Sequence, residues 1–224
     1  FKKIFGESPY ASPTDMGVNM AGYAIIDDEA AKDASCREIV RRYYHAQVDF
    51  LMGKINNKSL EKMQMLLSQA NVDAKNRKCA IVAKEKAELK QVPACAIELN
   101  DGQLISGKTS SLLRASSAAM LNALKYLAGI NQEIELISPT MLHSILSLKN
   151  NYLNIKNPLL DIDEVLLTLT IASSTEPNAK KCLEVLPLLK DCEIHSTVIL
   201  SNKDMATLRN LQMNLTCDPK YATA

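Results

Sequence analysis

Aromatic side chains are scarce in this sequence, which has no tryptophan and only three phenylalanines. Proteins that bind single-stranded nucleic acid commonly stack the bases on aromatic side chains, and this chain offers few of them. Its 26 basic and 25 acidic residues leave a net charge of +1, so there is no overall positive field to attract nucleic acid or an anionic membrane. We therefore expect neither nucleic acid nor a membrane as a partner.

Long apolar runs and paired cysteines are missing as well. No run approaches the roughly 18 apolar residues of a transmembrane helix, and the sequence shows no signal-peptide pattern. Its six cysteines are scattered without a C-x-x-C pair, and several lie within apolar runs, as is typical of small, reduced core residues. These features predict a cytoplasmic location.

Metal ligands are also few. The chain has three histidines, at positions 45, 143 and 195, and no paired ligand motif. Cys192 and His195 are three positions apart in an expected strand, and side chains at that spacing point to opposite faces of a sheet. A structural zinc site needs four ligands that converge on one point, so no metal site is predicted.

Two parts of the chain differ in their hydrophobic pattern. Residues 1–91 are predicted to form a polar loop followed by helices, because apolar residues recur at three- and four-residue steps; one of these helices, 76–90, could also be a buried strand over 79–83. From residue 92 onward, short apolar runs typical of strands alternate with helical patterns. The expected strands lie at 94–99, 103–106, 133–137, 192–200 and 213–216.

This pattern predicts the fold class and the domain division. We expect an α/β or α+β fold, in which a helical N-terminal segment (1–91, loop plus helices) precedes a mixed α/β domain (92–224). Strands that alternate with helices favour a single sheet with helices on its faces. That domain should hold a mixed sheet of about four or five strands with packed helices.

Residues 102–109 have two interpretations. Their letters, Gly-Gln-Leu-Ile-Ser-Gly-Lys-Thr, fit the phosphate-loop pattern G-x-x-x-x-G-K-[ST], and the apolar run before them and the helical run after them supply the order that this motif requires. The same letters fit a β-hairpin, because Asp101-Gly102 is a tight-turn signal and residues 103–106 alternate polar and apolar side chains. In both interpretations, Gly107, Lys108 and Thr109 precede a helix, where an anion could bind.

The loop 7–20 is the second candidate for ligand binding. It contains two prolines and a dense set of hydrogen-bonding side chains, and ordered polar loops often serve ligands. Those side chains could instead satisfy the backbone of the loop itself. The residues selected as ligand-binding candidates are Ser12, Thr14, Asp15 and Asn19, together with Gly107, Lys108 and Thr109.

Four stretches of the sequence resemble a bacterial protein family, domain of unknown function 1846. They are residues 7–29, 101–109, 187–201 and 214–221. The resemblance implies that this chain is the C-terminal portion of a longer cytoplasmic protein, whose N-terminal half looks like a nucleotide-binding α/β domain with its own glycine-rich, lysine-containing loop. If the phosphate loop lies in that half, the hairpin is the better interpretation of residues 102–109.

The function predicted in this way is that of a C-terminal module of a nucleotide- or phosphate-binding enzyme of unknown substrate. Its partner would be the rest of its own longer chain, and a nucleotide cofactor would be bound mainly by the N-terminal half. The alternative is a non-catalytic assembly module that forms a homo-oligomer. In that alternative, an apolar stripe on the first long helix, with Tyr43, Tyr44 and Leu51, packs against another chain.

Overall fold

The computed structural model describes residues 28–155 and 158–222. Contacts within the chain divide it into two compact units, Phe1–Arg77 and Lys78–Ala224. Each unit has its own core, and each is described separately below.

Helices make up the described part of the first unit. The helix α3 (Asp28–Leu51) packs against α4 (Asn57–Gln69), and a short 3-10 helix, η2 (Ala74–Asn76), follows. Of the apolar stripe predicted on α3, Tyr44 packs inside this unit, because it is only 4% exposed and its hydroxyl donates to the Ala74 carbonyl at 3.3 Å. Asn56 caps α4, and its side chain accepts a hydrogen bond from the Ser59 backbone N–H.

The second unit is built on a four-stranded mixed sheet, as predicted. Its order is β2-β1-β3-β4, in which β1 is antiparallel to both β2 and β3, and β3 is parallel to β4. The hairpin prediction is confirmed, because β1 and β2 are joined by a tight turn in which Gly102 has a φ of +85°. The strands are β1 (Ala94–Glu98), β2 (Leu104–Lys108), β3 (Glu193–Ser196) and β4 (Asn214–Cys217).

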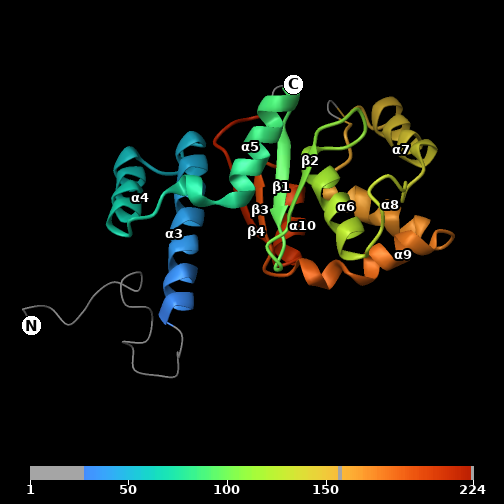
Figure 1. The fold of residues 1–224 in the computed structure, drawn as a ribbon. Coiled ribbons are helices and arrows are strands. Elements are labelled where there is room, and N and C mark those ends of the chain that lie inside the picture. Colours follow the sequence, from blue (N-terminus) through green and yellow to red (C-terminus); the bar gives the residue numbers. More distant parts are fainter. Residues whose placement is uncertain (1–27, 156–157, 223–224) are drawn as a thin grey trace, which may run out of the picture. The chain divides into compact units, whose positions relative to one another are not determined.

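Helices cover both faces of this sheet (Figure 1). The helix α5 (Lys78–Lys90) covers one face, where Cys79 and Ala83 pack with Ala96 of β1. The opposite face is covered by helices that include α6 (Ala115–Leu127) and α10 (Asn202–Asn210). The remaining elements are α7 (Pro139–Asn151), α8 (Ile162–Ala172), α9 (Pro177–Glu184) and the 3-10 helix η3 (Leu186–Leu189).

The helix α5 packs against the sheet, and the compact unit that holds the sheet begins at Lys78. Two other details differ from the sequence-based expectations. Residues 133–137 form no strand, although the apolar side chains of Leu136 and Ile137 are buried. The strand expected over 192–200 ends at Ser196, whose hydroxyl accepts a hydrogen bond from the Val198 backbone and turns the chain toward α10.

Gly107 is where α6 and the sheet approach most closely. A Cβ atom at this position would lie 2.2 Å from the backbone nitrogen of Ala119, a distance that no side chain can occupy. Ala119 itself is fully buried. The glycine in the apparent phosphate-loop motif is therefore required for packing between helix and strand.

Gly107→Ala should lower the free energy of unfolding by about 3 kcal/mol, because the added methyl group must push α6 away from β2. Gly102→Ala is the control: nothing lies within 4 Å of its Cβ, and only the positive φ opposes the change, which costs about 1 kcal/mol. Urea unfolding of both variants measures the difference. Equal losses in the two variants would show that close packing at Gly107 is unimportant.

Candidate functional site

A pocket of about 420 Å³ lies at the end of the two central strands of the sheet, where β3 ends and β1 begins. In open α/β sheets, ligands commonly bind beyond the carboxyl ends of strands, and the β3–α10 connection lies at such an end. The loop after β3 and the first turns of α6 and α10 form much of its wall. Its lining residues are Pro93, Thr109, Arg114, Ala115, Ser116, Leu159, Ser196, Val198, Ile199, Leu200, Ser201, Asp204 and Ala222.

The N-termini of three helices meet beside this pocket, and the carboxylate of Asp204 joins them. Asp204 lies in the first turn of α10 and is completely buried. One of its oxygens accepts a hydrogen bond from the backbone N–H of Ile162, the first residue of α8, at 2.8 Å. The other accepts from the hydroxyl of Ser116, in the first turn of α6, at 2.8 Å. Burial raises the pKa of Asp204, and these two hydrogen bonds oppose that shift.

Additional bonds hold the starts of α6 and α8 together. The Ser117 hydroxyl donates to the Leu160 carbonyl at 2.8 Å, and the Arg114 backbone N–H donates to the same carbonyl at 3.3 Å. In α8, Asp161 and Glu164 form a capping box. The position of the α6 N-terminus is therefore fixed by contacts from two other segments of the chain.

The N-terminus of α6 differs from that of α10 in having no side-chain cap. Ser201 caps α10 by accepting from the Asp204 backbone N–H at 3.1 Å. The N-cap residue of α6 is Arg114, and no side-chain hydrogen bond caps this helix. The first backbone N–H groups of a helix have no partner within the helix and carry a partial positive charge. In α6, the residues that carry these groups, Ala115 and Ser116, line the pocket.

Arg114 places a cation at the same end of the pocket. Its Nε lies 2.6 Å from an Asp161 carboxylate oxygen. No other ion pair of the Arg114 guanidinium occurs among the described residues. Because a guanidinium carries five N–H donors in a planar fork, its pairing with one carboxylate leaves donors for a second anion. Burial raises the pKa of Asp161, and the charge of Arg114 opposes this shift.

The residues selected from the sequence have different positions. Thr109 lines the pocket, whereas Lys108 is exposed at the end of β2 and Gly107 is buried beneath α6. The candidates in the N-terminal loop, Ser12, Thr14, Asp15 and Asn19, lie outside the described residues. Arg114, Ser116 and Asp204 were not selected, because nothing in the local sequence indicates that these distant residues meet.

A second cluster of polar groups, on the α5 side of the sheet, is a structural network. His195 Nδ1 lies 2.8 Å from the Thr216 hydroxyl, and His195 Nε2 lies 3.3 Å from Asp218, which also pairs with Lys84 at 3.1 Å. A hydroxyl, an imidazole and a carboxylate in this order resemble a nucleophilic triad. However, His195 and Thr216 are both completely buried, so no substrate can reach the hydroxyl.

The charge of Asp218 depends on this network. Burial by itself acts to raise the pKa of Asp218, but hydrogen bonds and charges from His195 and Lys84 together outweigh burial and hold it below its usual value. Asp218 therefore remains ionised in a site that is mostly shielded from solvent. We infer that it joins the end of β4 to β3 and α5.

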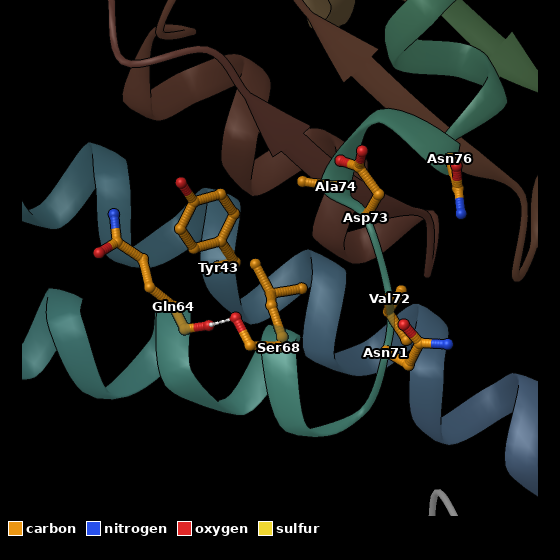
Figure 2. A pocket seen from close by; sticks show the side chains of 9 residues that line it. Tyr43, Gln64, Ser68, Asn71, Val72, Asp73, Ala74 and Asn76 are labelled. Carbon is orange, nitrogen blue, oxygen red and sulfur yellow. Dashed lines mark hydrogen bonds between the residues drawn. The ribbon is translucent and has the colours of Figure 1, made fainter.

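A second hollow, of about 490 Å³, lies in the first unit between α3, α4 and the segment 71–76 (Figure 2). Among the described residues that line it, Asp73 is the one with a charged side chain, and it already caps η2. Figure 2 shows that the amide groups of Gln64 and Asn71 point away from each other. Binding sites place a few polar groups so that they converge on the ligand, and this hollow lacks such an arrangement.

The described part of the chain contains neither a metal-binding cluster nor a membrane-spanning helix. Within 28–155 and 158–222, no group of three or more His, Cys, Asp or Glu side chains is arranged to hold a metal ion. None of the helices in these ranges combines the length and the apolar composition needed to cross a lipid bilayer.

Two family models match this chain. The C-terminal part of the domain of unknown function DUF1846 matches residues 75–224, and the N-terminal part matches residues 1–71. The chain belongs to the DUF1846 family. Proteins named "UPF0371 protein" from Streptococcus pneumoniae strains CGSP14 and JJA are each 44% identical to it over 220 residues, which is 98% of this chain. The match covers 44% of each of these relatives, so the chain spans less than half of their length.

The DUF1846 matches correct one expectation. We expected the chain to correspond to the C-terminal portion of the family alone, but residues 1–71 belong to the N-terminal domain of DUF1846. The sequence analysis separated this segment from the α/β domain but did not assign it to the family's N-terminal domain. The boundary between the two family models, at residues 71–75, lies close in the sequence to the division between the two compact units, after Arg77.

Asp218→Asn should lower the free energy of unfolding by about 2 kcal/mol at neutral pH, because it removes a buried charge that is paired with two partners. Since the folded-state pKa is depressed, this stabilisation is present above the pKa of the unfolded state, about 3.9, and is lost as the pH falls through the folded-state value. Urea unfolding at several pH values should therefore show a difference between wild type and variant that shrinks under acidic conditions.

Asp191→Asn provides the matched control, because Asp191 is exposed and its left-handed backbone, with a φ of 64°, suits asparagine as well. This variant should unfold like the wild type at every pH. If the effect of Asp218→Asn instead grew on acidification, the charge of Asp218 would not be the stabilising feature.

Proposed function

We propose that the second unit binds a small phosphate-bearing molecule in the pocket beside Asp204, as part of a nucleotide- or phosphate-handling enzyme of the cytoplasm. The observation that carries this proposal is the first turn of α6, which lines a pocket without a side-chain cap and with Arg114 next to it. Backbone N–H groups at a helix N-terminus and an arginine are the usual ligands of phosphate groups in proteins.

The chemistry of the remaining lining supports a ligand of this kind. Hydroxyl groups of Thr109, Ser196 and Ser201 lie around the pocket, and hydroxyls can both donate and accept hydrogen bonds. A volume of about 420 Å³ falls within the usual range of small-molecule sites, about 300–1,000 Å³. The carboxylate of Asp204 does not repel an anion as strongly as its charge suggests, because both of its oxygens accept hydrogen bonds.

The proposal also locates the predicted ligand residues. Thr109 is the member of the 107–109 segment that would contact the ligand, whereas Gly107 would act only through packing. Lys108 and the candidates of the loop 7–20 stay predictions. The substrate, the reaction and the contribution of any further part of the family's longer chains are also open to test.

Assembly through α3 has less support than ligand binding. The stripe that suggested it includes Tyr44, which is buried within the first unit, whereas Phe50 and Leu51 at the end of α3 are 43% and 44% exposed. Large assembly surfaces usually present several apolar residues that together form one patch. We therefore do not assign a homo-oligomer to this helix.

A melting screen with inorganic phosphate and a panel of phosphate monoesters tests the proposal, because a ligand that binds only the folded protein raises its melting temperature. For a ligand found in this way, Arg114→Gln should weaken binding about 10- to 100-fold, since it removes charge-assisted hydrogen bonds worth about 1.5–3 kcal/mol. Isothermal titration calorimetry measures this change.

Arg209→Gln is the matched control, because Arg209 is exposed in the last turn of α10, away from the pocket lining. This variant should bind the ligand as the wild type does. The proposal is wrong if no phosphate compound binds, or if Arg114→Gln leaves the affinity unchanged.

A further inference from the structure

The charges around the pocket are almost balanced. Among the described residues that line it, Arg114 is the only cation and Asp204 the only anion. The positive charge of Arg114 is already paired with Asp161, which lies 2.6 Å away. A ligand with several negative charges would therefore enter a site that has little positive charge left to compensate them, and uncompensated charge is costly away from water.

The pocket also lacks the groups that proteins use for polyphosphates. None of the described residues that line it is a lysine, although the phosphate loop of nucleotide triphosphatases uses one to reach the β- and γ-phosphates. Those sites also bind Mg²⁺ through an acidic side chain and a hydroxyl. Here, both oxygens of the one acidic residue, Asp204, are occupied by Ser116 and Ile162.

What the site does provide is sufficient for one phosphate. The first turn of α6 contributes a partial charge of about +0.5, and the terminal nitrogens of Arg114 can hold two oxygens of the same group. Apolar side chains also supply part of the wall. They are Pro93, Leu159, Val198, Ile199 and Leu200. Such a wall favours an uncharged ring or an apolar group on the ligand.

We propose that the ligand of this pocket is a phosphate monoester that joins a single phosphate to an uncharged ring system, as a nucleoside monophosphate does, and that the pocket discriminates against di- and triphosphates. The proposal rests on the function proposed above. In addition, it assigns to Asp161 the role of a positioning residue that holds Arg114 by Nε and limits the charge that the site accepts.

Isothermal titration calorimetry with AMP, ADP, ATP and ribose 5-phosphate tests this proposal on the whole chain. AMP should bind at least about tenfold more tightly than ATP, because the two additional phosphates of ATP lack a compensating charge. It should also bind about tenfold more tightly than ribose 5-phosphate, which carries the same phosphate without the base. ATP that binds as tightly as AMP, or ribose 5-phosphate that equals AMP, overturns the proposal.

Asp161→Asn tests the charge limit directly. Asparagine is as good an N-cap as aspartate, so α8 should keep its start, while one negative charge near Arg114 disappears. The preference for AMP over ATP should then fall about threefold or more. An unchanged preference overturns the role assigned to Asp161. Circular dichroism melting of the variant shows whether the fold is retained.

The same titrations separate this inference from the proposed function. If ATP binds best and Arg114→Gln abolishes its binding, the pocket is a phosphate site but the preference for one phosphate is wrong. If none of the four compounds binds and inorganic phosphate does not bind either, the proposed function fails together with the inference.

Discussion

The organisation of the second unit depends on the two hydrogen bonds that the buried carboxylate of Asp204 accepts. Asp204 lies in α10, yet its two hydrogen bonds reach α6 and α8, which are 88 and 42 positions away in the sequence. Helix N-termini carry partial positive charge, so three of them can meet only where a negative group compensates them. Without this carboxylate, the Ile162 N–H and the Ser116 hydroxyl would lose their partners inside the protein, which is costly. The pocket wall would then lose its fixed geometry.

Under the proposed function, this arrangement supplies the anion site in a chain with few glycines. A phosphate loop brings successive backbone N–H groups toward the ligand by means of flexible, small residues. Here, the glycines of the apparent motif are used otherwise: Gly102 forms the hairpin turn, and Gly107 allows α6 to lie against β2. The donors offered to a ligand come instead from the rigid first turn of α6, whose position is fixed by Asp204 and by the contacts of Leu160. A site on rigid elements needs little reorganisation when a ligand binds.

Local features of the fold could be predicted from the sequence, because they depend on neighbouring residues. The hairpin turn at Asp101-Gly102 was predicted correctly, and the capping box from Asp161 to Glu164 is a local pattern of the same kind. The position of α5 against the sheet and the junction at Asp204 could not be predicted, since both depend on contacts between distant segments. For the same reason, Thr109 is the one residue of the pocket lining that was selected from the sequence. That selection rested on the apparent phosphate-loop motif, whose residues form a β-hairpin in the structure.

Nuclear magnetic resonance offers the most direct test of the claim that the first turn of α6 binds a phosphate group. In a titration of the isotopically labelled chain with AMP, the largest shifts of backbone amide signals should occur at Ala115, Ser116 and Ser117, where the N–H groups would donate to the phosphate. Smaller shifts should follow in the loop after β3. If these three amides did not respond, or if the largest shifts occurred around Lys108 or within the first unit, the α6 N-terminus would not be the phosphate site.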